Sequence, residues 1–203
     1  MKILSFDVGI VNLAYCIIDT SNINIVKWEV IELTNCSDFT ARVPSGNKKI
    51  AKAANDIHIS LILNLDQRPF LLDTDVVLIE KQPSFNPKMR IIAGCLQSYF
   101  YIRGIVDKPE NKISSVEFFS PKNKLKCYTG PELDISSKNG KIVKSKYAQT
   151  KKMGVLIAQE KLKEYSETTF KTLFDTHKKK DDLSDCYLQA LTYHAMKTKT
   201  LNR

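Results

Sequence analysis

Three short runs rich in β-branched and other apolar residues open the chain, and only a few residues separate them. The runs span residues 2–8, 12–19 and 23–33, and the segments that connect them are residues 9–11 and 20–22. A parallel connection needs a crossover of a dozen or more residues, so joints this short require antiparallel pairing. The chain therefore begins with three consecutive antiparallel strands.

The remainder of the chain alternates between helical and strand patterns. Apolar spacing predicts helices over 48–65, 88–103 and 145–165 and from Asp181 to about Lys197, with Gly104 ending the second. Continuous apolar runs predict strands over 75–80 and 113–119, and polar stretches predict loops over 34–47 and 166–180. A right-handed crossover then places the 75–80 strand beside the first strand and parallel to it. The fold class is α/β, with a mixed five-stranded sheet of three antiparallel and then parallel strands, flanked by helices.

Length and charge narrow the functional classes. The 203 residues fit one domain, 1–203, with a polar and basic insertion at about 121–145. The formal net charge of +9 favours a polyanionic partner such as nucleic acid. Five scattered cysteines indicate reduced thiols and lack zinc-site spacing, and no apolar run approaches membrane-spanning length. We therefore expect a soluble, intracellular protein with no membrane partner.

Acidic residues occur at three places where α/β proteins commonly carry catalytic or metal-binding side chains. Asp7 ends the first strand, Glu80 ends the 75–80 strand, and Asp182 and Asp185 lie on one face at the start of the last helix. Each has an ordinary explanation as well: Asp-x-Gly can open a hairpin turn, Glu80 can meet solvent, and acids near a helix N-terminus act as caps. Asp181 is the expected cap.

The coincidence of these placements in a basic chain favours a metal site. Four carboxylates brought together repel one another unless cations neutralise them. Hard oxygen ligands select Mg²⁺ or Mn²⁺, and two such ions can support in-line displacement at phosphorus. The prediction is a metal-dependent phosphodiester site with two ions, held by Asp7, Glu80, Asp182 and Asp185.

Three segments together resemble the RuvC-like Holliday junction resolvases. They are Phe6–Tyr15 (FDVGIVNLAY), Ile79–Pro83 (IEKQP) and Lys180–Asp185 (KDDLSD), supported by Ser120–Leu125 (SPKNKL). The likeness is greatest to the branch found in poxviruses and other large DNA viruses, which is similar to the mitochondrial resolvases of fungi. It extends from Met1 to about Met196.

This resemblance implies an RNase H-like fold, a homodimer, and an endonuclease that makes paired symmetric nicks in four-way DNA junctions with Mg²⁺ or Mn²⁺. Asp7 and Glu80 match the two strand acids of the family, and Asp182 and Asp185 match its helical pair. A viral member would act in the host cytoplasm or virus factory. The long basic segment from about Lys126 to Lys146 departs from compact viral members and leaves open how the substrate is held.

Basic residues near the acidic motifs are candidates for phosphate contacts. They are Lys81, Lys88, Arg90, Lys122, Lys124, Lys179 and Lys180. Phe85 is a candidate for stacking at a branch point, and the apolar stripe of helix 88–103 fits either core packing or a dimer surface. Two alternatives remain: an RNase H-like nuclease acting on RNA–DNA hybrids or flaps, and a non-catalytic branched-DNA-binding protein.

Overall fold

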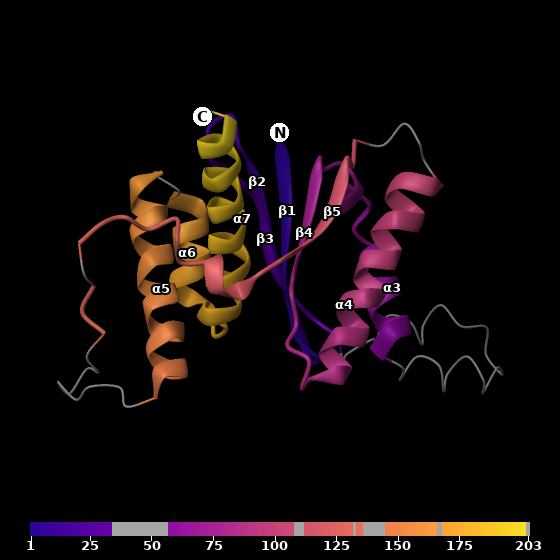
Figure 1. Ribbon diagram of the computed structural model, residues 1–203, viewed down its shortest axis with the longest axis horizontal. Helices are drawn as coiled ribbons and strands as arrows, with labels where there is room; N and C mark the ends of the chain where they lie inside the picture. Colours follow the sequence, from indigo (N-terminus) through magenta and orange to yellow (C-terminus); the bar gives the residue numbers. More distant parts are fainter. Residues whose placement is uncertain (34–56, 108–111, 132, 136–144, 166–167, 202–203) are drawn as a thin grey trace.

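A five-stranded mixed sheet forms the centre of the protein (Figure 1). The computed structural model describes residues 1–33, 57–107, 112–131, 133–135, 145–165 and 168–201. The strands are β1 (Lys2–Val8), β2 (Asn12–Asp19), β3 (Asn24–Glu32), β4 (Val76–Glu80) and β5 (Ser115–Phe119). Their order is β3-β2-β1-β4-β5, with antiparallel pairing among the first three and parallel pairing of β4 with β1 and β5. The predicted fold class and strand pairing are confirmed.

Helices cover both faces of this sheet (Figure 1). On one face α7 (Lys180–Leu201) packs against β1 and β2, with α5 (Lys146–Glu164) and α6 (Thr168–Thr176) outside it. The other face carries α3 (Ile57–Asp66), α4 (Pro87–Tyr99) and the short 3₁₀ turn η1 (Pro69–Leu72).

Alternation along β1 divides its side chains between the two cores. Ile3 belongs to the cluster under α7, whereas Leu4, Phe6 and Val8 belong to the cluster under α3 and α4. Ser5 and Asp7 share the parity of Ile3, so they lie on the α7 face. The acid at the end of β1 therefore faces the terminal helix.

Two expectations about the helices are wrong. Residues 168–176, placed in a loop, form α6, because Phe174 is fully buried and stacks on Trp28 with ring centroids 5.3 Å apart. Gly104 does not end a helix: α4 continues into the π-helical segment η2 (Phe100–Val106). A Cβ at Gly104 would lie 2.6 Å from Ile113 Cδ1, so this glycine allows close packing instead.

Other boundaries differ by smaller amounts. The last helix begins at Lys180 and runs to Leu201, four residues beyond the expected end, so Asp181 lies in its first turn instead of preceding it. The described part of the predicted 48–65 helix is helical as α3, while residues 34–56 lie outside the described residues. The basic insertion starts with a 3₁₀ turn, η3 (Pro121–Asn123), and its residues 132 and 136–144 are also outside them. None of the described helices is long and apolar enough to cross a membrane.

Candidate active site

Asp7 and Glu80 meet at the carboxyl ends of two adjacent parallel strands. The register pairs Phe6 of β1 with Ile79 of β4, so the next residue of each strand is an acid. Burial raises the pKa of Asp7 well above its usual value, and the charges of Glu80 and Asp185 and a hydrogen bond with Glu80 raise it further. The topology thus places two strand acids in contact, as predicted.

The terminal helix adds Asp185 to this pair. Burial and the charge of Glu80 raise the pKa of Asp185, although the Lys124 ammonium opposes the shift. Asp185 also packs close to α5, where a Cβ on Gly154 would lie 3.6 Å from its Oδ1. Three carboxylates from β1, β4 and α7 therefore share one partly buried space.

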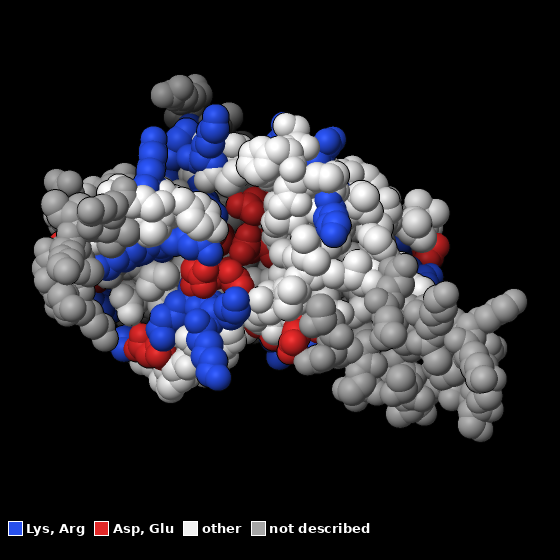
Figure 2. Space-filling view, turned by 90° about the horizontal axis from the view of Figure 1, so that it is seen from below, with Lys and Arg blue, Asp and Glu red and all other residues white. Residues whose placement is uncertain are grey.

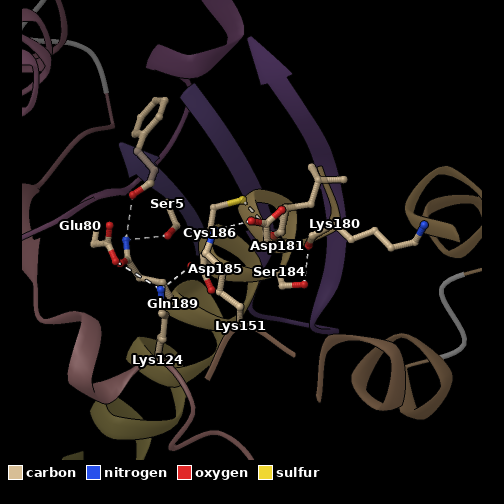
Figure 3. A network of polar contacts seen from close by, with 12 residues as sticks. Ser5, Glu80, Lys124, Lys151, Lys180, Asp181, Ser184, Asp185, Cys186 and Gln189 are labelled. Atoms are coloured by element: carbon tan, nitrogen blue, oxygen red, sulfur yellow. Dashed lines mark hydrogen bonds and ion pairs between the residues drawn. The ribbon is translucent and has the colours of Figure 1, made fainter. Parts of the chain in front are cut away.

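Lys124 lies inside this acidic group instead of on the outer surface (Figure 3). Its Nζ donates to Glu80 Oε1 at 3.3 Å and to Asp185 Oδ2 at 2.5 Å, and its side chain is only 12% exposed. Burial alone would lower the pKa of Lys124, but the charges of Asp185 and Glu80 outweigh it and raise that pKa. The lysine supplies the positive charge that holds two of the carboxylates together.

Asp182 lies at the edge of the group. Burial and the neighbouring Asp181 raise the pKa of Asp182, and the charges that oppose the shift come from Lys179, Lys151 and His177. Asp181 is paired with Lys151, whose Nζ is 2.5 Å from its Oδ2 (Figure 3). In the part of the chain that the structure describes, no three His, Cys, Asp or Glu side chains are grouped closely enough to hold a metal ion.

All four acids nevertheless line one open cleft of about 350 Å³. Seen from the carboxyl ends of β1 and β4, acidic side chains gather in a hollow with lysines around it (Figure 2). The opposite wall comes from α5, with Tyr147, Thr150 and Lys151. Their spacing of three and four residues puts them on one helix face, so this wall of the cleft has a signal in the sequence.

The predicted phosphate-binding residues lie in four different surroundings. Lys124 is within the acidic group, and Lys179 lines the cleft. Lys180 donates to the backbone oxygens of Asp175 and His177, so it ties the α6–α7 connection. The others are exposed on the surface: Lys81, Lys88, Arg90 and Lys122.

A mixed sheet with this strand order and helices on both faces is the fold of solved resolvases, RuvC among them. The fowlpox virus resolvase, solved with Holliday junction DNA, aligns with a TM-score of 0.58 at 20% identity, covering 97% of this chain and 99% of that one. The yeast mitochondrial resolvase Ydc2 also gives 0.58, at 18% identity over 98% and 82% of the two chains. Thermus thermophilus RuvC with its Holliday junction substrate gives 0.54, at 14% identity over 98% and 97%.

The chain belongs to the poxvirus A22 protein family, whose model matches residues 1–197. A relative from Acanthamoeba polyphaga mimivirus, the uncharacterized protein L451, is 41% identical over 169 residues. That match covers 80% of this chain but only 40% of the relative, so the chain spans less than half of that protein. The resemblance drawn from the sequence motifs is confirmed in family and in fold.

Proposed function

We propose that this protein is a metal-dependent endonuclease that resolves four-way DNA junctions by paired symmetric nicks. The observation that carries the proposal is the meeting of Asp7, Glu80 and Asp185 from three separate elements in a cleft bordered by lysines. The fowlpox and Thermus relatives in fold were solved with Holliday junctions, which supports a junction as the substrate. Such a family member would act where viral DNA recombines, in the host cytoplasm or virus factory.

The chemistry of the donor set suits a divalent cation, which would have to draw the carboxylates closer together than they lie in the described residues. Its acids offer hard oxygen ligands. Burial and then the charges of Glu80 and Asp185 raise the pKa of Asp7, and a cation held among these acids would offset that unfavourable charge. Asp7, Glu80 and Asp185 would hold Mg²⁺ or Mn²⁺, with Asp182 completing the set from the edge. Two bound ions would supply charge for activating a water and stabilising the leaving oxygen.

Lys124 has a separate role in this proposal. Its ammonium keeps the carboxylates of Glu80 and Asp185 together while the site is free of cations, because it contacts both. A cation held by these acids would replace the counter-charge of Lys124, whose ammonium would then be available to a DNA phosphate. Lys124 is therefore a residue of the reaction centre, not an outer phosphate contact.

Other residues of the cleft and its rim would hold the DNA. Lys151 and Lys179 line the cleft and can contact phosphates, and Tyr147, 70% exposed at its mouth, offers a stacking surface. Phe85, which is 85% exposed in the loop after Glu80, is placed to stack on an unpaired base. These contacts favour branched DNA, whose bases open at the branch point.

The experiment uses end-labelled four-way junction, linear duplex and RNA–DNA hybrid, each with and without Mg²⁺, and compares the protein with Asp7→Asn. We expect paired nicks only in the junction, only with the metal, and none by Asp7→Asn, which still binds the junction through its unchanged lysines. Cleavage confined to the hybrid would indicate an RNase H-like enzyme. Junction binding with no cutting under any condition would indicate a binding protein, and unchanged cutting by Asp7→Asn would refute the assigned site.

A further inference from the structure

A line of polar residues runs along one side of α7. Asp182, Asp185, Gln189 and Thr192 are separated by three, four and three residues, which places them on one side of the helix. The first two are the candidate site acids. The last two are 1% exposed and lie within the apolar layer between α7 and the sheet. Buried polar groups of this kind are costly unless they are hydrogen-bonded, so their partners are informative.

Gln189 is bonded to β1, two residues before the site acid of that strand (Figure 3). Its Nε2 donates to Ser5 Oγ at 2.9 Å and to the Phe6 backbone oxygen at 3.3 Å. Ser5 is fully buried and lies on the same face of the strand as Asp7. The hydrogen bond between Gln189 and Ser5 therefore connects α7 to β1, and each of these elements carries a candidate metal ligand.

The spacing on the two elements matches. β1 and α7 run in opposite directions, because the N-terminus of β1 and the C-terminus of α7 lie at the same end of the molecule (Figure 1). From Ser5 to Asp7 the strand advances about 6.7 Å. From Gln189 back to Asp185 the helix covers about 6 Å in the same direction. A contact at Gln189 and Ser5 therefore brings Asp185 beside Asp7, and both acids line the same cleft.

Thr192 makes the corresponding connection to Lys124. Its Oγ1 donates to the Lys124 backbone oxygen at 2.9 Å and accepts from the Cys127 backbone N–H at 3.2 Å. Both bonds hold the turn that carries Lys124 against α7. One face of α7 thus contacts or bears three parts of the site: the end of β1, the Lys124 turn and Asp185 itself.

We infer that Gln189 and Thr192 are positioning residues that set the register of α7 against β1 and the Lys124 turn, and thereby assemble the carboxylates for metal binding. Apolar side chains at these two positions could be buried equally well, but their packing would tolerate a helix displaced along the sheet. Gln189 and Thr192 would lose their hydrogen-bond partners on such a displacement. The inference rests on the proposed function, since it assigns the assembled acids to metal.

The first test compares Gln189→Met, Ser5→Ala and the double variant with the wild type. Gln189→Met leaves a buried hydroxyl and carbonyl short of a donor, so we expect Tm to fall by about 2–6 °C. The double variant removes the hydroxyl as well and should recover most of that loss. Mn²⁺ affinity, measured by calorimetry without DNA, should fall about tenfold in Gln189→Met and stay low in the double variant.

A matched control separates positioning from general stability. Leu188→Ala removes buried apolar atoms from the same helix and lowers Tm, but we expect its Mn²⁺ affinity at a temperature well below Tm to equal that of the wild type. A double variant that regains both stability and Mn²⁺ affinity would overturn the role of Gln189. So would a Leu188→Ala variant that loses Mn²⁺ affinity to the same extent.

Thr192 is tested by a conservative pair. Thr192→Val keeps the shape but removes Oγ1, and we expect kcat for junction cleavage to fall about tenfold with junction affinity unchanged. Thr192→Ser keeps the hydroxyl and should restore kcat. Equal kcat in Thr192→Val and the wild type, or equal losses in the Val and Ser variants, would refute the assignment.

Crystal structures of the wild type and the Ser5→Ala/Gln189→Met variant, grown without metal, make the test independent of both binding and catalysis. We expect the separation of Asp7 and Asp185 to change in the variant, and superimposable helices would overturn the inference. If the wild type binds Mn²⁺ but cuts no junction, the proposed function fails while the comparison of Mn²⁺ affinities still decides the role of Gln189. If the wild type binds no Mn²⁺, the metal site fails and the two structures decide the register.

Discussion

Lys124 shows how strongly a single buried cation can shape an acidic site. Its side chain is 12% exposed, and its two carboxylate partners are 13% and 17% exposed. Replacing it by Met leaves Glu80 and Asp185 without their shared counter-charge. We expect Lys124→Met to lower the free energy of unfolding by about 3 kcal/mol in EDTA, measured by urea denaturation, and Mg²⁺ to restore part of it. The exposed neighbour Lys122→Met should change it by less than about 0.5 kcal/mol; equal stability of the two variants would contradict the assignment.

Asp7 allows a prediction about pH. Its pKa is raised in the folded state, so as pH rises the unfolded chain releases the Asp7 proton first. The free energy of unfolding therefore falls between the ordinary pKa and the raised folded pKa of Asp7, and it stays lower above that folded pKa. Below the ordinary value of 3.8 both states are protonated and the contribution disappears. We therefore expect Asp7→Asn to be more stable than the wild type at pH 7 without metal, and this difference to vanish as pH falls below about 3.8. Measuring Tm of both proteins as a function of pH tests the prediction. A destabilised Asp7→Asn at pH 7 would show that the charge is already compensated.

At the scale of elements, Trp28 of β3 joins α6 and α7 to the sheet. Its Nε1 donates to the Leu183 backbone oxygen at 3.0 Å, just before Asp185, and its ring stacks on Phe174 of α6 with an interplanar angle of 9°. We expect Phe174→Ala to lower the free energy of unfolding by about 3–5 kcal/mol, because it removes the fully buried anchor of α6. Fluorescence of Trp28, the single tryptophan, reports the change directly. Leu173→Ala, at a position 36% exposed, is the control and should cost less than about 1 kcal/mol.

At the scale of the whole molecule, paired nicking requires two active sites, and we propose a homodimer. Helix α4 and the following η2 expose large apolar side chains that a second copy could cover: Ile91 on α4 and Tyr101, Ile102, Ile105 and Val106 on η2. We expect sedimentation to give a dimer mass for the wild type and a monomer mass for Ile102→Glu/Val106→Glu. Val26→Glu, at an exposed position on β3, should remain dimeric. A monomeric wild type with junction bound would contradict the proposal.

Much of the architecture could be predicted because its causes are local. Short joints required antiparallel pairing, and the first two strands match their predicted bounds, Lys2–Val8 and Asn12–Asp19. The helix α6 was missed because its stabilising contact, Phe174 on Trp28, joins distant parts of the chain. Gly104 was misjudged because the reason for a glycine there is the side chain of Ile113 from a later segment.

The sequence by itself determined the strands of the sheet and the placement of the acids at two strand ends and at the start of the last helix. Strand formation, short connections and helix starts depend on neighbouring residues in the chain. Only the tertiary structure decided which side chains meet in the cleft. Lys124 reaches Asp185 across 61 residues and Gln189 reaches Ser5 across 184, and both contacts depend on how a helix is seated on the sheet. Apolar periodicity selects the face that a helix buries but leaves its position along the strand open, so that position is set by specific polar contacts formed only in the folded protein.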